Sequence, residues 1–154
     1  MKYFIIAISV SAALITTNIS YAEDNQIKVE SDKLFVSQNP TKSIFTGDVY
    51  AYDSEIKIWS DKVIITFYGP DNKIDTIEGV GKVKLIRGNE EIDADLIFYD
   101  LSKSSIKAKG NITAKQSGNI VIGDQLDIDL LNSTSIIKSR KSNRVKATIQ
   151  KENE

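Results

Sequence analysis

Residues 56–65 read IKIWSDKVII, and the same pattern occurs earlier, where residues 27–36 read IKVESDKLFV. Apolar residues alternate with charged or polar ones in both stretches, which is the period of a half-buried β-strand. The alternation continues to residue 149, and no stretch keeps the spacing of an amphipathic helix for long. Turn residues such as Gly69-Pro70 and Gly88-Asn89 divide it into about eight long segments. The sequence therefore predicts an all-β chain.

Two signatures alternate along these segments. The first is an aspartate with apolar or aromatic residues three positions before it and two and four positions after it, and it recurs at Asp32, Asp61, Asp95 and Asp124. The second is a glycine with a β-branched residue two positions later, and it recurs at Gly47, Gly81 and Gly110. A fourth glycine is missing, and Ser139 lies near the corresponding position, as expected of an atypical end repeat.

The spacing within the first signature predicts a bend. Side chains alternate across a strand, so apolar residues three before and two after one aspartate face the same side only if the strand bends between them. A glycine in mid-strand likewise marks a bulge or tight bend. We therefore expect a folded-over antiparallel β-jellyroll of about sixteen short strands in two facing layers, with an apolar trough along its length. Each aspartate is expected at a corner, bonding its own backbone two residues on.

The N-terminus has the features of a secretory signal. Lys2 precedes an apolar run over residues 3–15, and the small residues around Tyr21 end at Ala22. The run is shorter than the roughly 18 apolar residues that span a bilayer. We expect residues 1–22 to be a cleaved signal peptide and residues 23–154 to be a single domain. An uncleaved membrane anchor is the alternative interpretation.

Composition limits the chemistry that is available. The chain has no Cys and no His, so thiol chemistry, disulfides and the usual general base near neutral pH are excluded. No serine lies in a Gly-x-Ser-x-Gly elbow, and no glycine-rich phosphate loop is present. The net charge of −1 gives no overall attraction to nucleic acid. We expect a protein that is not an enzyme and needs no cofactor.

The acidic residues invite a metal or glycosidase interpretation, because carboxylates at fixed spacing serve both chemistries. One aspartate per repeat at a predicted corner favours a structural role instead. The densest acidic patch comprises Glu90, Glu91, Asp93 and Asp95. It is typical of a solvated strand face, and we assign it no chemistry.

The C-terminal stretch is strongly basic. It contains Lys138, Arg140, Lys141, Arg144 and Lys146, with no acidic residue between positions 129 and 152. One interpretation is contact with the phosphates of a lipid head group or with an acidic partner surface. The other is that the cations guard a terminal edge strand against unwanted pairing. The sequence leaves both open.

Four stretches carry a family resemblance, namely residues 27–36 quoted above, residues 45–67 (FTGDVYAYDSEIKIWSDKVIITF), residues 77–85 (IEGVGKVKL) and residues 106–115 (IKAKGNITAK). They resemble the LptA/OstA-like family of periplasmic lipopolysaccharide-transport proteins over nearly the whole predicted mature chain. The strongest piece is Phe-Thr-Gly-Asp-Val followed by Ser-Asp-Lys-Val, in the order and spacing that the family uses.

The resemblance implies a periplasmic carrier whose trough holds the acyl chains of lipopolysaccharide, that is, its lipid A part. It also implies partners: an inner-membrane LptC-like protein, an outer-membrane LptD-like translocon, and further copies joined head to tail. Pattern matching gives the expected trough residues as Val29, Leu34, Val36, Val49, Ile58, Val63, Ile65, Val83, Leu85, Ile92, Ile97, Ile112, Val121, Leu126 and Ile128.

Alternatives remain at this point. The pattern alone does not distinguish an open trough from a filled core, because inward Val and Ile residues serve both. A structural β-repeat protein that self-assembles without lipid is one rival. The membrane-anchored LptC-like member of the same pathway, which shares the fold, is the other.

Overall fold

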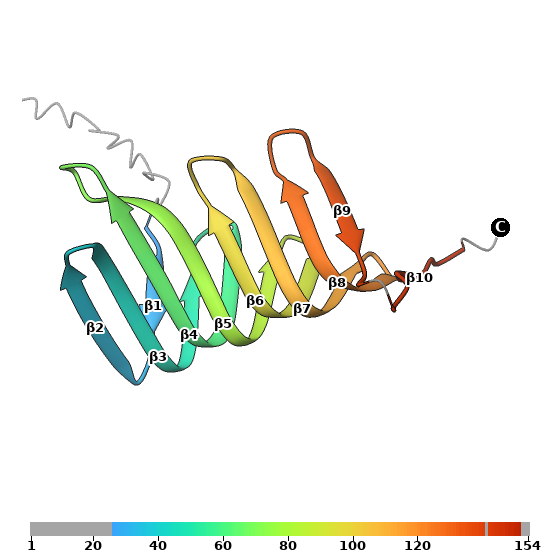
Figure 1. The fold of residues 1–154 in the computed structure, drawn as a ribbon, viewed down its shortest axis with the longest axis horizontal. Helices are drawn as coiled ribbons and strands as arrows, with labels where there is room; N and C mark the ends of the chain where they lie inside the picture. The colour runs from blue at the N-terminus through green and yellow to red at the C-terminus, as the bar shows by residue number, and fades with distance from the viewer. Residues whose placement is uncertain (1–25, 141, 152–154) are drawn as a thin grey trace, which may run out of the picture.

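The structure, a computed structural model, describes residues 26–140 and 142–151, and within these ranges it contains only strands and their connections (Figure 1). The strands are β1 (Lys28–Glu30), β2 (Lys33–Gln38), β3 (Thr41–Tyr52), β4 (Ile56–Tyr68), β5 (Lys73–Arg87), β6 (Glu90–Asp100), β7 (Ser105–Gln116), β8 (Asn119–Asp129), β9 (Thr134–Lys138) and β10 (Lys146–Thr148). In this part of the chain no helix has the length and apolar character needed to cross a bilayer. The predicted signal peptide lies outside the described residues.

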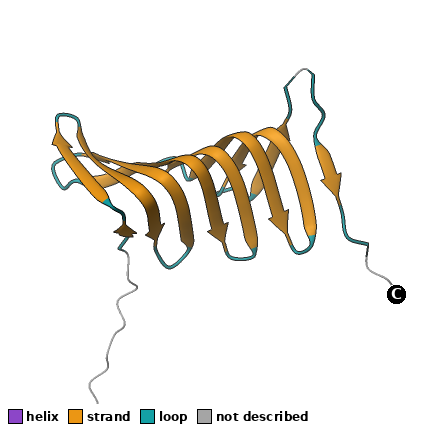
Figure 2. Ribbon diagram, turned by 90° about the horizontal axis from the view of Figure 1, so that it is seen from below, coloured by secondary structure: helices purple, strands orange, loops and turns teal. Residues whose placement is uncertain are grey.

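The strands form one antiparallel sheet in which chain neighbours are also spatial neighbours. β3 to β8 pair in sequence order, and short strands pair with the two halves of each end strand. β2 pairs with the first half of β3 and β1 with its second half, while β9 and β10 pair with separate halves of β8. Figure 2 shows the long strands curving over at their middles, so that every long strand contributes to both layers.

The bends lie where the sequence predicts them. The pairing register shifts between Thr46 and Val49 in β3, and equivalent shifts interrupt the middles of β4 to β7. Gly47, Gly81 and Gly110 have φ values of +85°, +82° and +78°. The described residues thus form ten strands, and β3 to β8 are bent at their middles. The predicted number of about sixteen short strands is reached only when the two halves of each bent strand are counted separately.

A corner glycine is necessary because of what lies beside it. The carboxylates of Asp32, Asp61 and Asp95 fill the space that a Cβ would occupy on Gly47, Gly81 and Gly110, respectively, of the next strand. A side chain on these glycines would therefore meet an aspartate as well as an unfavourable backbone conformation. The first three aspartate signatures are each joined in this way to the glycine signature that follows.

The corner aspartates were predicted to bond their own backbone two residues on, and this prediction is wrong for Asp95 and Asp124. Asp95 accepts a hydrogen bond from Asn111 Nδ2 at 2.8 Å, and Asp124 accepts one from the Arg140 backbone N–H at 2.9 Å. The local bond comes from the preceding serine, since Ser60 Oγ donates to the Lys62 carbonyl at 2.9 Å. The carboxylates reach across to the next strand because the bend turns them toward it.

Candidate binding trough

Three rows of inward side chains run along the molecule. Each row takes one residue from every strand that it crosses, and neighbouring members of a row are directly opposed in the strand pairing. Directly opposed residues of antiparallel strands share a face, so each row is continuous. In one layer the rows are Leu34, Phe45, Val63, Gly79, Ile97, Ala108, Leu126, Ile137 and Val36, Ser43, Ile65, Ile77, Tyr99, Ile106, Ile128, Ser135. In the facing layer the row is Val29, Ala51, Ile58, Leu85, Ile92, Ala114, Val121, Ala147.

The expected trough residues fall on these rows or beside the corners, and most of them are buried. The buried ones are Val49, Ile58, Val63, Ile65, Val83, Leu85, Ile92, Ile97, Ile112, Leu126 and Ile128. Val29 and Val121 are half-buried. Leu34 and Val36 are 53% and 59% exposed because they lie on the terminal strand β2, which the short facing strand β1 does not cover.

The centre of the trough is filled by its own side chains. Gly79 illustrates how closely the layers approach, because a Cβ on this residue would lie 3.5 Å from Ile58 Cγ2 in the facing layer. A space of only about 10 Å³ remains beside Ile58, Ile77 and Tyr99. This part of the interior is packed like an ordinary protein core.

The C-terminal end of the trough is more open. A cavity of about 160 Å³ lies there, with Ala114, Val121, Leu126 and Ile137 as its apolar lining. A cavity of roughly 150 Å³ accommodates a molecule the size of benzene. This cavity is therefore too small for a long acyl chain unless the two layers move apart.

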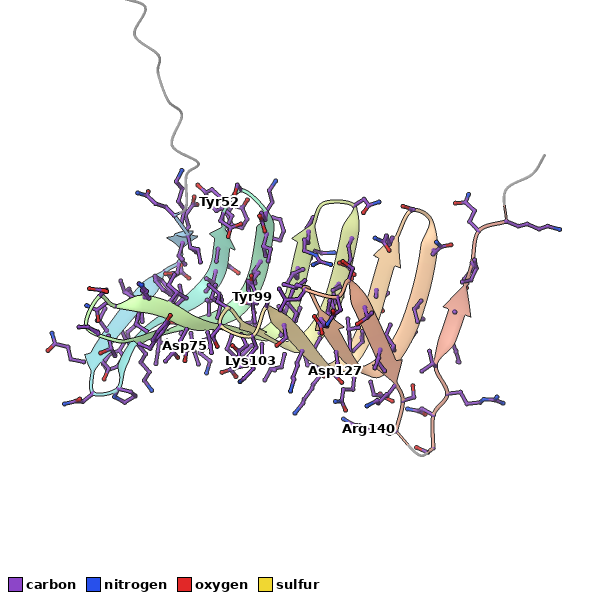
Figure 3. All side chains as sticks on the ribbon, turned by 90° about the horizontal axis from the view of Figure 1, so that it is seen from above. Tyr52, Asp75, Tyr99, Lys103, Asp127 and Arg140 are labelled. Carbon is purple, nitrogen blue, oxygen red and sulfur yellow. The ribbon has the colours of Figure 1, made fainter. Side chains whose placement is uncertain are left out.

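The long open side of the trough is bordered by two lips, which are the turns of the two layers. On one layer, the residues near the turns that pack against the core are Phe67, Ile74, Leu101 and Leu130. Both lips also carry charges, and the opposite lip has the pair Arg87 Nη2 and Glu90 Oε2 at 2.8 Å. Backbone hydrogen bonding between the strands extends into the turns, since the Leu101 N–H donates to the Asp75 carbonyl at 3.0 Å. Figure 3 shows Asp75 and Lys103 on one side and Tyr52 on the other.

Asp100 fixes the turn after β6. Its carboxylate, only 8% exposed, accepts hydrogen bonds from Lys103 Nζ and Ser102 Oγ, both at 2.8 Å, and from the Lys103 N–H at 3.0 Å. The bond from Lys103, followed by that from Ser102, lowers the pKa of Asp100 to about 2. Asp100 is therefore ionised throughout the physiological range and holds the lip in place.

Tyr99 places a polar atom among the apolar rows. Burial, followed by the nearby charges of Glu55 and Asp53, raises the pKa of the Tyr99 phenol above its usual value of 10.0. The neutral phenol is therefore retained at all ordinary pH values. Tyr99 lines the wall of the trough without adding charge to it.

The acidic patch is occupied by ion pairs. Glu91 and Asp93 pair with Lys84 and Lys115, and the Lys84 Nζ–Glu91 Oε1 distance is 2.5 Å. The bond from Lys84, with a second from Lys115, lowers the pKa of Glu91. The described residues contain no group of three or more potential ligands suited to a metal ion.

The basic residues of the C-terminal stretch lie on the last strands and on the connection between them. Lys138 belongs to β9, Lys146 to β10, and Arg140 and Arg144 to the intervening loop; all four are exposed. Lys141 lies outside the described residues. Figure 3 labels Arg140 at this end of the sheet.

Sequence reasoning missed several inward residues. They are Phe45, Ala51, Ile77, Ile106 and Ala108. Their sequence separation from the corner glycine could have revealed them. The residues four and two positions before each corner glycine, and the residue four positions after it, also face inward. Ser43 and Gly79 occupy two of these positions, so apolar character alone does not reveal the pattern.

The fold and the inner rows together define a class of protein, an open two-layer β-trough built from repeated bent strands. Residues 28–134 match the model of the family described as LptA/(LptD N-terminal domain) LPS transport protein. The chain belongs to this family of transport proteins.

Individual relatives agree with this assignment. The chain is 35% identical over 57 residues to LPS-assembly protein LptD of Thiobacillus denitrificans, covering 37% of this chain and 8% of that protein. It is 24% identical over 120 residues to an uncharacterized protein, R00383, of Rhizobium meliloti, covering 73% of this chain and 64% of that one. The chain thus spans less than two thirds of these relatives' lengths.

A solved structure shows the same fold. LptH of Pseudomonas aeruginosa is the LptA homologous periplasmic component of the lipopolysaccharide transport device, and it superposes with a TM-score of 0.74. The similarity covers 84% of this chain and 98% of LptH at 15% sequence identity. The predicted all-β, folded-over architecture is confirmed by this match.

Proposed function

We propose that this protein is a periplasmic carrier and bridge component for lipopolysaccharide, which holds the acyl chains of lipid A between its two layers. The observation that carries the proposal is the continuity of the inner rows. The three rows begin at Leu34, Val36 and Val29 at one end of the sheet and end at Ile137, Ser135 and Ala147, respectively, at the other. A chain on these rows can pass along the molecule without leaving apolar surroundings.

Burial energy suits such a carrier. Each buried methylene contributes about 0.8 kcal/mol, so a twelve-carbon acyl chain gains on the order of 10 kcal/mol over water. Release into water is therefore slow. Transfer to a similar trough on a neighbouring protein retains most of the burial and requires no nucleotide chemistry on this chain.

The layers must separate to admit lipid, because the centre is filled and the end cavity holds about 160 Å³. The fold permits this. One antiparallel sheet forms both layers, joined at the corners and open along the turns, so widening the angle at the corners parts the layers without breaking strand pairing.

The two ends supply the bridging surfaces. β2 at one end and β9 with β10 at the other are edge strands, and edge strands pair readily with another chain. Addition of a strand from an LptC-like or LptD-like protein, or from a second copy, would extend the inner rows into the partner. We expect export to remove residues 1–22, so that the sequence of the exported protein begins at Glu23; retention of these residues would favour the membrane-anchored LptC-like alternative.

The filled centre favours one rival, a structural β-repeat protein that assembles through its edges and holds no lipid. Binding of purified protein to lipopolysaccharide, lipid A and deacylated lipopolysaccharide distinguishes the two. We expect the first two to bind and the deacylated form to bind far more weakly. Ile137→Asp, which alters the cavity lining, should weaken lipid A binding, whereas Ile136→Asp on the outer face should not. Equal binding of the deacylated form would contradict the carrier function.

A further inference from the structure

Three cations lie together on the outer face of the sheet at its C-terminal end, away from the trough. Lys109 of β7 and Lys138 of β9 flank Gln125 of β8 in one cross-strand row, and Arg140 follows two residues after Lys138. They line a cavity of about 380 Å³ with Gln125, Asp124 and Ser139. Lys109 belongs to β7, which is paired on both sides, so protection of an edge strand does not account for its place in the cluster.

Unlike several other cations of the sheet, these three form no ion pair within the described residues, and the nearby carboxylate whose charge acts on Arg140 is Asp124. Lys84, Arg87 and Lys103 each lie within ion-pair distance of a carboxylate. Within the described part of the chain, Lys109 and Lys138 form no ion pair. The same holds for the guanidinium of Arg140, whose backbone is nevertheless held in position.

Asp124 provides that positioning. Its Oδ2 accepts a hydrogen bond from the Arg140 backbone N–H at 2.9 Å and a longer one from Asn143 Nδ2 at 3.5 Å. In the other repeats the corner aspartate lies against a glycine. In this last repeat the backbone of Arg140 contacts the aspartate instead. Asp124 thereby fixes the loop from which Arg140 extends and leaves the guanidinium available.

We propose that Lys109, Lys138 and Arg140 form a binding site for a phosphate group. Three cations against the single carboxylate of Asp124 leave a net charge of about +2, which a phosphate dianion neutralises. A guanidinium fork with two ammonium groups suits the tetrahedral oxygens of phosphate better than a carboxylate. A lipid head group and free phosphate present the same chemistry to this site.

The site shares no residue with the inner rows, so it is tested separately from the trough. The probe is inorganic pyrophosphate, titrated calorimetrically into the exported protein at low ionic strength. The test variant is Lys109→Gln/Lys138→Gln/Arg140→Gln. The control is Lys33→Gln/Lys57→Gln/Lys73→Gln, which removes the same charge from exposed positions elsewhere. We expect affinity to fall by on the order of tenfold or more in the test variant and to be unchanged in the control.

Vesicles and an acidic peptide identify the source of the phosphate. Binding to phosphatidic acid vesicles that is lost in the test variant and absent with phosphatidylcholine supports a lipid head group. Pyrophosphate binding without vesicle binding supports free phosphate. The site is overturned if the test and control variants lose the same amount of pyrophosphate affinity. It is also overturned if the protein binds polyglutamic acid but neither pyrophosphate nor phosphatidic acid vesicles. Binding of the fluorescent fatty acid cis-parinaric acid reports on the trough alone, so its failure would leave the phosphate site standing.

Discussion

The carboxylate of Asp95 occupies the position that a Cβ would take on Gly110 in the next strand. Gly110 also has a φ of +78°, so the corner requires glycine for two independent reasons. The same contact joins an aspartate to a glycine of the following long strand in the two preceding repeats. Three corners of the fold are thus held by an aspartate side chain that fits only against a residue without a side chain.

Gly110→Ala should therefore destabilise the protein more than the unfavourable φ of an alanine at this position would alone. The matched control is Gly88→Ala, at a φ of +57° with no atom near the added Cβ. We expect a loss of about 1 kcal/mol for the control and about 2 to 4 kcal/mol for Gly110→Ala, measured by urea unfolding. Equal losses would show that the aspartate contact adds nothing.

Asp100 should contribute to acid sensitivity. Its pKa is about 2 in the folded protein, below the ordinary 3.8, so it stabilises the fold above about pH 4 and loses this effect as pH falls toward 2. Asp100→Asn should lower the urea midpoint at pH 7, and its difference from wild type should shrink below pH 3. Asp71→Asn, in an exposed turn, serves as the control. A constant difference between pH 7 and pH 2.5 would exclude this role.

Locking the layers together should block lipid binding. Gly79→Cys with Ile58→Cys joins facing residues of the two layers, which the separation of 3.5 Å from the added Cβ to Ile58 Cγ2 permits. In this otherwise cysteine-free chain, the oxidised variant should lose lipid A binding and regain it on reduction.

The control disulfide joins neighbours within one layer, by Thr46→Cys with Lys62→Cys, which are directly opposed in β3 and β4. It should leave lipid binding unchanged in either redox state. Full lipid binding by the oxidised cross-layer variant would show that the layers need not separate.

A charge at the exposed edge should reduce self-association. Val36 is 59% exposed at the β2 end of an inner row, so Val36→Asp costs little burial in the monomer and places a charge where a second copy would continue the row. Leu131→Asp, 77% exposed in a turn, is the control. Sedimentation at rising concentration should show fewer oligomers for Val36→Asp only. Unchanged association would place the contact elsewhere.

Much of the fold follows from local pattern. The spacing around Asp61 and Asp95 predicted the bends, because two-residue alternation breaks there in a way that only a corner explains. The bond partners of the aspartates were not predictable, since the carboxylates reach another strand whose position depends on the complete sheet. The exposure of Leu34 was beyond local pattern for the same reason: its row is apolar, but its strand lies at the end of the molecule.

The most direct test of the carrier function is photo-crosslinking in cells with a small diazirine amino acid at Ile65, compared with its neighbour Ile64. Ile65 is on an inner row and 4% exposed, whereas Ile64 lies on the outer face between Ile44 and Glu78. We predict lipopolysaccharide adducts at Ile65 and none at Ile64. Absence of adducts at Ile65, with protein adducts at β2 and β9, would contradict the carrier and leave a structural filament.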